Sequence, residues 1–405
     1  MTLDSTQRLG IMPLIPSLRS YDWGSRHAIA DLFGWVSTDE PMAELWFGAH
    51  PEGSARVVGD RQRSTLAELV SADPTAMLGS ADVAAFGPRL PFLLKVLAAE
   101  KPLSLQVHPS PAQARAGFAD EVARGIPASA PERNYRDDNY KPELLCALTE
   151  FWALNGFRPV VDTARLLQDL GVLDLDPLRI LMHPTGDVRA TVDALLKADD
   201  DDVQTLVDAV LHGARTLVSG DGEWVDEATW VLSIADAFPG DAGIVLALLL
   251  NLVHLQPGQF LFVPAGQVHG YLRGTGIEIM ASSDNVLRCG LTSKHVDRAE
   301  VMRIADFSDG PGRVQDPVRR PTGELGFAAP VRDFALSRLT MEAGQEFTVA
   351  CPGAQIVLCI AGQLTIQAAQ HETPLYPGTA VFVPAGVDVH LSGTGDVFRA
   401  TTNVG

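Results

Sequence analysis

A histidine that follows two closely spaced turns is the first residue in this sequence that could bind a metal ion. Gly258 and Gly266 flank a short apolar stretch that ends at Pro264, and His269 follows three residues after the second glycine. Pro-Gly and Pro-x-Gly steps are turn signals, so we expect a strand between them. Because side chains alternate along a strand, the second turn can direct His269 toward the inside of a sheet.

One histidine does not make a metal site, because protein sites supply three or four convergent donors. Gln106 and His108 follow an apolar run, and residues two apart on a strand share one face. Glu143, in the sequence Tyr-Lys-Pro-Glu, begins another apolar stretch and is the best candidate for a carboxylate ligand. We therefore expect one divalent ion to be bound by four side chains, Gln106, His108, Glu143 and His269. Taken alone, the pair at 106 and 108 would instead indicate the polar end of a strand.

The pattern of two turns around a short strand occurs twice in the chain. LQPGQFLFVPAGQVH ends at His269, and LYPGTAVFVPAGVDVH ends at His390. Each copy has Pro-Gly, five residues, Pro-Ala-Gly and then a histidine. Two copies of one β unit predict two similar β-barrels in one chain.

The first copy resembles the second sequence signature of the cupin barrels, in which a His-x-His pair on an earlier strand supplies further ligands. The residues Gln106-Val107-His108 stand in that earlier place. Before the second copy, the corresponding place holds Cys359-Ile360-Ala361, which cannot bind a hard ion, and His390 is displaced by one residue. We therefore expect the second barrel to bind no metal and Cys359 to lie in its core.

Between about residues 158 and 250 the apolar residues adopt a helical period. One helical face is formed at i, i+3, i+4, i+7 and i+8 by Val203, Leu206, Val207, Val210 and Leu211. The aspartates at 199–202 supply an N-cap and acids for its first turn. We expect a mainly β protein with an α insert: two cupin-type β-barrels (jelly rolls) plus an inserted helical domain. The parts are a catalytic barrel with the metal site at 1–157 and 251–320, a helical insert at 158–250, and a metal-free C-terminal barrel at 321–405.

The composition is that of a globular protein of two or three domains, with 405 residues of which 46% are hydrophobic and 20% charged. A formal net charge of −19 argues against binding to nucleic acid or anionic membranes, since both need clustered Lys and Arg. We expect neither a membrane span nor a signal peptide. The four cysteines form no CxxC pair, so we expect free thiols and a cytoplasmic protein. We also expect a monomer.

Longer stretches between residues 43 and 297 carry a more specific resemblance. They are AELWFGAHP (43–51), FLLKVLAAEKPLSLQVHP (92–109), NYKPELLCAL (139–148), PAGQVHGY (264–271) and GIEIMASSDNVLRCGLTSKHVD (276–297), and YDWGS (21–25) agrees with them. In these stretches the chain resembles the type I mannose-6-phosphate isomerases (phosphomannose isomerases), which interconvert D-mannose 6-phosphate and D-fructose 6-phosphate. The resemblance implies an enzyme with one Zn²⁺ per chain, a small sugar phosphate as its partner, and an enediol or enediolate intermediate.

The resemblance also implies roles for individual residues, with the zinc held by the four ligands named above. It gives catalytic roles to Lys141, Glu278 and Arg288. It gives substrate-binding roles to Lys95, Ser104, Tyr271 and Asp284. One difference from the family matters, because Tyr140 stands where many bacterial members have a histidine, so the resemblance does not identify the proton-transfer base.

The charge of the ligand set suits an isomerisation. One carboxylate with a neutral amide and two neutral imidazoles leaves a divalent ion with a net positive charge, which stabilises an anionic intermediate. We expect Arg288 to stabilise the enediolate, because arginine is a poor base, although a salt bridge to Asp284 or Glu278 is an alternative. Glu278 is a candidate general base if burial raises its pKa.

Two other functions are open on the sequence alone. One is a non-catalytic cupin that binds a sugar phosphate. The other is a metal-dependent cupin oxygenase, because two histidines and one carboxylate also form the ligand set of non-haem iron oxygenases. The additional glutamine, and the lack of a signal for 2-oxoacid binding, favour the isomerase over the oxygenase.

Overall fold

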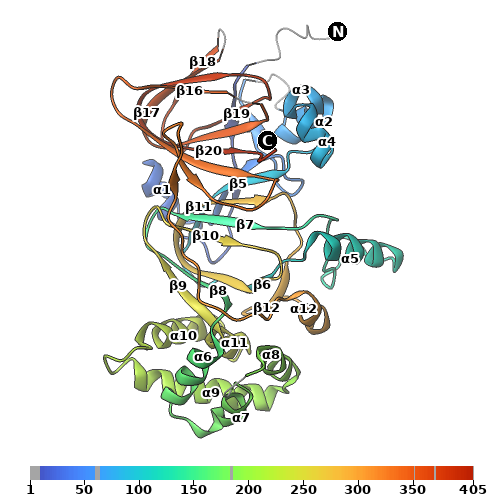
Figure 1. The fold of residues 1–405 in the computed structure, drawn as a ribbon, viewed down its shortest axis with the longest axis vertical. Helices are drawn as coiled ribbons and strands as arrows, with labels where there is room; N and C mark the ends of the chain where they lie inside the picture. The colour runs from blue at the N-terminus through green and yellow to red at the C-terminus, as the bar shows by residue number, and fades with distance from the viewer. Residues whose placement is uncertain (1–9, 60–63, 183–185, 351, 369–370, 405) are drawn as a thin grey trace.

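The computed structural model describes residues 10–59, 64–182, 186–350, 352–368 and 371–404. Cys351 and the N-terminal residues 1–9, where we expect no signal peptide, lie outside these ranges. The protein is mainly β, with two sheets that have ten strands each in the described chain. Figure 1 shows the sheet of β17 and β20 at the top, the sheet of β7 and β11 in the middle, and helices α6 to α11 at the bottom.

The middle sheet contains the predicted metal ligands. Its strands are β2 (Ser17–Arg19), β3 (Glu44–Gly48), β5 (Phe92–Ala99), β6 (Leu105–Val107), β7 (Glu143–Ala147), β8 (Phe151–Phe157), β9 (Leu250–Leu255), β10 (Phe260–Val263), β11 (His269–Ala281) and β12 (Leu287–Gly290). The long strand β11 pairs with β6 and β8 at its start and with β5 and β7 further along, always antiparallel. Strand β11 therefore brings together segments that are far apart in the sequence.

The upper sheet is built mostly from the C-terminal part of the chain. Its strands are β1 (Met12–Ile15), β4 (Arg56–Val57), β13 (Val318–Arg319), β14 (Leu325–Phe327), β15 (Ala335–Met341), β16 (Glu346–Val349), β17 (Gln355–Ala368), β18 (His371–Leu375), β19 (Ala380–Val383) and β20 (Val389–Thr401). The N-terminal strand β1 pairs with β19, where Met12 lies opposite Phe382. The two ends of the described chain thus contribute to one sheet.

The sequence repeat corresponds to the same structure in both sheets. The strand predicted between the two turns is confirmed as β10 in the first copy and β19 in the second, and a long strand, β11 or β20, follows each. Gly258 and Gly266 have φ angles of 92° and 83°, and Gly378 and Gly386 have 84° and 76°. Glycine adopts this left-handed backbone conformation more readily than other residues, which explains why both turns have a glycine in both copies.

The predicted helical stretch is present between β8 and β9. Its helices are α6 (Val160–Asp169), α7 (Asp176–Leu181), α8 (Val188–Lys197), α9 (Asp200–Leu217), α10 (Val225–Ala237) and α11 (Gly243–Leu248), with a 3-10 turn at Leu173–Leu175. Asp199 caps α9 by accepting a hydrogen bond from the Asp202 backbone N–H, as expected. Val207 and Val210 are buried, in a core that also contains Leu105 and Leu154 of the middle sheet. The helices are therefore packed against the end of that sheet.

Shorter helices and aromatic contacts complete the packing. The remaining helices are α1 (Ala28–Phe33), α2 (Leu66–Ala72), α3 (Pro74–Leu78), α4 (Ser80–Phe86), α5 (Pro111–Ala123) and α12 (Arg298–Ile304). Phe327 lies 5.5 Å from Phe260 of the middle sheet and 5.9 Å from Phe398 of the upper one, measured between ring centroids. The two sheets thus share one apolar core, which holds them in a fixed arrangement.

The cysteine side chains of the described residues agree with the expectation of free thiols and of a core position for Cys359. Cys146, Cys289 and Cys359 are free and buried, and Cys359 lies in the core of the upper sheet.

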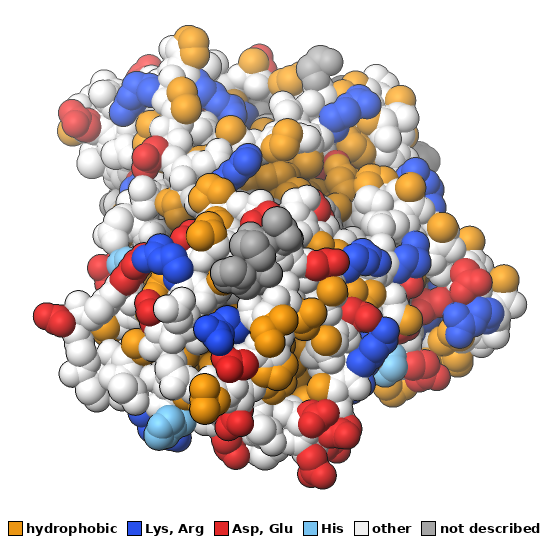
Figure 2. Space-filling model, turned by 60° about the horizontal axis from the view of Figure 1, so that its bottom comes forward, with side chains coloured by type: hydrophobic (Ala, Val, Ile, Leu, Met, Phe, Trp, Pro, Cys, Tyr) orange, Lys and Arg blue, Asp and Glu red, His pale blue; other side chains and the backbone are white. Residues whose placement is uncertain are grey.

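Within the described ranges, none of the helices has the length and apolar character needed to cross a membrane. On the face shown in Figure 2, Lys and Arg side chains are scattered among acidic ones, and hydrophobic side chains show in a hollow.

Candidate metal centre and its surroundings

Three of the predicted ligands converge on one point. His108 follows β6 directly, Glu143 is the first residue of β7, and His269 is the first residue of β11. Their donor atoms all lie within 4.8 Å of one another. His269 Nε2 is 3.2 Å from Glu143 Oε2, and His108 Nε2 is 3.4 Å from Glu143 Oε1. All three side chains are buried, so this group could hold a metal ion.

Backbone carbonyls orient both imidazoles. The Nδ1–H of His108 donates to the carbonyl oxygen of Asn285 at 2.8 Å, and that of His269 donates to the carbonyl oxygen of Gln267 at 3.0 Å. This leaves the Nε2 lone pairs directed at Glu143, and His108 Nε2 has no hydrogen-bond partner among the described residues. A histidine whose other nitrogen is held in this way is typical of metal ligands, so the residues fit a divalent ion.

The protonation states of these side chains also suit metal binding. Burial lowers the pKa of His108 to about 4, and the charge of Lys141 acts in the same direction. Burial alone would raise the pKa of Glu143, but the charge of Lys141 and the two neighbouring histidines hold it well below its usual range. At neutral pH the imidazole of His108 is therefore neutral and Glu143 is ionised, as metal ligands must be.

Gln106 lies beside this group. It is directly opposite His269 of β11 and directly opposite Arg288 of β12, and opposed residues of antiparallel strands project to the same face. The side-chain amide N–H of Gln106 donates to Ser104 Oγ at 3.2 Å. Its carbonyl oxygen is consequently the atom left to act as a ligand.

Lys95 lies between two buried carboxylates. Its Nζ is 2.9 Å from Glu278 Oε2 and 3.4 Å from Glu44 Oε1, and Trp46 Nε1–H donates to the other oxygen of Glu44 at 2.8 Å. Burial acts to lower the pKa of Lys95, but the two carboxylates raise it above its ordinary value, so the amine stays charged. Burial raises the pKa of Glu278, and Lys95 opposes that shift.

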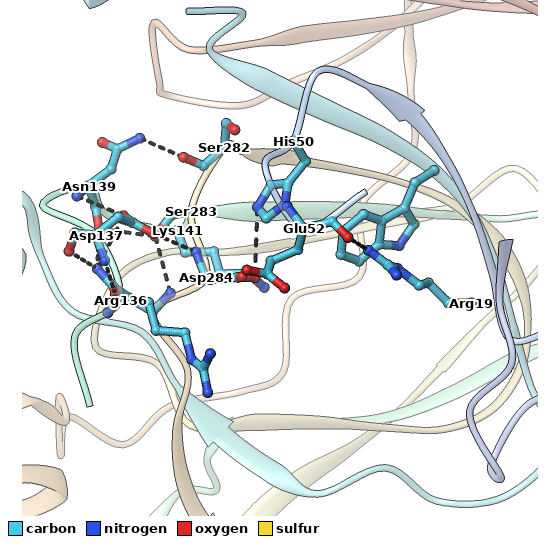
Figure 3. Close-up of polar contacts among 12 residues, drawn as sticks. Arg19, His50, Glu52, Arg136, Asp137, Asn139, Lys141, Ser282, Ser283 and Asp284 are labelled. Carbon is cyan, nitrogen blue, oxygen red and sulfur yellow. Dashed lines mark hydrogen bonds and ion pairs between the residues drawn. The ribbon is translucent and has the colours of Figure 1, made fainter. Parts of the chain in front are cut away.

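A network of hydrogen bonds ties the segment before β7 to the segment after β11 (Figure 3). Asp137 accepts from Ser283 Oγ at 2.8 Å and from the Asp284 backbone N–H at 2.7 Å. The Asn285 side-chain amide donates to the carbonyl oxygens of Asp137 and Asn139 at 2.8 and 2.7 Å. Because the Asn285 carbonyl also holds His108, this network links the ligand to the segment before β7.

Asp284 and Lys141, both labelled in Figure 3, lie close enough to His50 for their charges to affect its pKa. The Nζ of Lys141 contacts Glu143 Oε1, and Lys141 is buried. Asp284 Oδ1 is 3.7 Å from Nε2 of His50, a buried histidine. Asp284 and Lys141, which have predicted roles, therefore lie close to His50, a titratable residue that was not predicted from the sequence.

Arg288 belongs to a group of cations. It is half-buried, and its pKa is lowered by burial and by Arg136, while the pKa of Lys294 is lowered chiefly by Arg288. Among the described residues Arg288 has no ion pair, so the salt bridge considered as an alternative is not present. Tyr271 is buried two residues after His269, and its hydroxyl has no hydrogen-bond partner in the described chain. Arg136, Arg288 and Lys294 have no carboxylate partner within the described parts of the chain, and three such neighbouring cations are suited to an anionic ligand.

Four residues near the centre were not singled out from the sequence: Glu44, Trp46, His50 and Asn285. The first three lie in the stretch AELWFGAHP, which carried part of the family resemblance, so a signal for them existed. Asn285 is wholly buried and acts through its backbone and amide hydrogen bonds. Asn285 lies in the stretch 276–297, which also carried part of the family resemblance, but the partners of its hydrogen bonds are apparent only in the folded chain.

Comparisons with known proteins agree with this geometry. Residues 11–160 match the family model of the phosphomannose isomerase type I catalytic domain, and residues 324–402 match that of the mannose-6-phosphate isomerase cupin domain. The chain is 39% identical over 390 residues to a mannose-6-phosphate isomerase of Salmonella typhimurium, with 95% of this chain and 98% of that one covered. It is 31% identical over 412 residues to that of Mus musculus, with 94% and 95% covered.

A solved structure shows the same likeness in three dimensions. A crystal structure of a mannose 6-phosphate isomerase, described as holo and zinc bound, has a TM-score of 0.89 at 37% identity, covering 97% of this chain and 99% of that one. The fold and the site thus define a protein with a cupin domain and a buried site that could hold a metal ion. The chain belongs to the type I mannose-6-phosphate isomerase family.

Proposed function

We propose that this chain is a zinc-dependent aldose–ketose isomerase that interconverts D-mannose 6-phosphate and D-fructose 6-phosphate through an enediolate. The observation that carries the proposal is the convergence of His108, Glu143 and His269 within 4.8 Å. Gln106 is the proposed fourth ligand, through its carbonyl oxygen. One carboxylate among four donors leaves a site of net positive charge, which suits an anionic intermediate better than a site with two carboxylates would.

A zinc ion at these residues would polarise the oxygens on C1 and C2 of the open-chain sugar. The proton on C2 of the aldose moves to C1, and the hydroxyl proton on O2 moves to O1, so that the carbonyl group passes from C1 to C2. Glu278 is our proposed general base, since burial raises the pKa of its carboxyl. Arg288, opposite Gln106 in the sheet, stabilises the negative charge that develops on oxygen. Lys141 contacts Glu143 and orients it. In this proposal Lys141 also donates hydrogen bonds to the oxygens on C1 and C2 of the sugar.

The remaining predicted residues bind the substrate in this proposal. The substrate-binding set is Lys95, Ser104, Tyr271 and Asp284. Tyr271 suits this role because its hydroxyl lacks a partner among the described residues, and Ser104 because it lies beside Gln106. The phosphate dianion is drawn to the cations Arg136, Arg288 and Lys294, whose charges are close enough to affect one another.

We also propose that the two sheets are cupin-type barrels. The catalytic barrel would comprise residues 1–157 and 251–320, the helical insert 158–250, and the metal-free C-terminal barrel 321–405. Strands β1 and β4 of the N-terminal segment pair within the upper sheet, so this segment contributes to both. We propose a monomer in the cytoplasm whose partner is the sugar phosphate and which binds neither nucleic acid nor membrane.

Elemental analysis of the purified protein, combined with a coupled assay on mannose 6-phosphate, tests the function. We expect close to one zinc per chain and formation of fructose 6-phosphate that stops when a chelator removes the metal. Zinc binding without turnover would identify a sugar-phosphate-binding protein instead. Oxygen consumption with iron and not with zinc would identify an oxygenase.

A further inference from the structure

Tyr140 makes a contact that joins the two sheets. Its hydroxyl donates a hydrogen bond to Asp333 Oδ2, across 193 positions in the sequence. Tyr140 stands shortly before β7 of the middle sheet, and Asp333 lies between β14 and β15 of the upper sheet. The side chain just before the Lys-Pro-Glu triplet is therefore directed at the upper sheet.

Asp333 is 5% exposed, and burial raises the pKa of its carboxyl while the bond from Tyr140 lowers it. A buried carboxylate needs a hydrogen-bond donor, so the phenol of Tyr140 stabilises it. In turn, burial and Asp333 raise the pKa of Tyr140 above its ordinary value. The hydroxyl of Tyr140 is therefore engaged in its hydrogen bond to Asp333.

The next residue faces the opposite way. Lys141 precedes Pro142, which favours an extended backbone at Lys141, and successive side chains of an extended segment point to opposite sides. Tyr140 accordingly contacts the upper sheet, while Lys141 contacts Glu143 in the metal centre. Holding the ring of Tyr140 in place fixes the backbone from which the Lys141 side chain projects.

We propose that Tyr140 is a positioning residue, and that its hydrogen bond to Asp333 uses the upper sheet to set the place of Lys141 beside Glu143. This inference rests on the proposed isomerase function. It gives the upper sheet a part in catalysis and removes Tyr140 from the set of proton carriers. A displacement of about 1 Å of a group that contacts the substrate can lower the rate by up to about a hundredfold.

The test is a double-mutant cycle on kcat, KM and zinc content in the full-length holoenzyme. Tyr140→Phe removes only the hydroxyl, and Asp333→Leu removes only its acceptor. We expect each to lower kcat by about tenfold or more at full zinc loading, and the double variant to be no worse than either single one. Asp333→Asn, which keeps an acceptor oxygen, should retain most of the activity.

Ser337→Ala is the matched control, since Ser337 donates to the buried Glu324 at 2.7 Å within the upper sheet alone. This variant should lose stability without losing kcat. Circular dichroism sets a temperature at which every variant is folded. If Tyr140→Phe is inactive while Asp333→Leu is normal, Tyr140 is itself a proton carrier and the proposal is wrong. It is equally wrong if both variants keep the wild-type kcat, whereas an inactive wild-type holoenzyme would refute the isomerase function instead.

Discussion

Lys95 and Glu278 are directly opposite each other on β5 and β11, and their charged ends lie 2.9 Å apart in the interior. Glu44 approaches the same amine at 3.4 Å from the neighbouring strand β3. The amine therefore balances two carboxylates that have lost most of their contact with water. Such a group keeps Glu278 in place, and the loss of its central cation would leave two buried acids uncompensated.

Lys95→Met should for this reason destabilise the fold as well as affect substrate binding. We expect the free energy of unfolding in urea to fall by about 3–5 kcal/mol, the usual cost of breaking a buried pair from one side. Replacing Glu278 by Gln in the same chain should recover part of the loss, since one of the two unpaired acids is then gone. A loss below about 1 kcal/mol, as for an exposed pair, would contradict the buried arrangement.

Removal of a proposed ligand should reduce zinc binding and turnover together. For His269→Ala we expect zinc affinity to fall by more than about tenfold, because the remaining donors no longer surround the ion. His390→Ala is the matched control, since His390 ends the second copy of the repeat and lies exposed beside Thr348. Plasma emission analysis after dialysis against a zinc buffer measures the zinc bound by each variant. Equal losses of zinc in the two variants would refute the assigned metal centre.

The local features of the fold could be predicted because each depends on neighbouring residues. The helix α9 and its Asp199 cap follow from apolar spacing and an acidic start, and β10 and β19 follow from the turn glycines that flank them. The convergence of His108, Glu143 and His269 was also predicted, with help from the family resemblance.

Contacts that depend on strand pairing could not be predicted in this way. Nothing near Lys95 in the sequence indicates that Glu44 lies beside it, because β3 and β5 are paired only in the folded sheet. The bond between Tyr140 and Asp333 likewise depends on how one sheet packs on the other. The pairing of β1 with β19 was missed for the same reason, since a four-residue strand carries little information about its distant partner.

Arg288→Ala should separate metal binding from catalysis. The guanidinium faces the same side of the sheet as Gln106, but it is not a metal ligand, so we expect zinc content to remain at the wild-type level. Loss of a group that stabilises charge in the transition state typically lowers kcat by about 10²–10³-fold. Arg313→Ala serves as a control for a general change of charge. Near-normal kcat in Arg288→Ala would remove the arginine from the proposed mechanism.

His50 predicts a pH dependence of stability. Burial lowers its pKa below the ordinary value of 6.5, with Asp284 opposing and Lys95 and Lys141 assisting that shift. The folded protein therefore favours the neutral imidazole, while the unfolded chain binds a proton below pH 6.5. The contribution of His50 is complete above pH 6.5 and is lost as the pH falls toward the lower, folded-state pKa.

We accordingly expect the free energy of unfolding to decrease between pH 7.5 and 5.5 more steeply in the wild type than in His50→Gln, with both at the same excess of zinc. The glutamine does not titrate, and its amide can still donate to Asp284. One such group contributes a slope of at most about 1.4 kcal/mol per pH unit. Urea unfolding at several pH values measures the two slopes, and parallel curves would mean that His50 titrates as freely in the folded protein as in the unfolded chain.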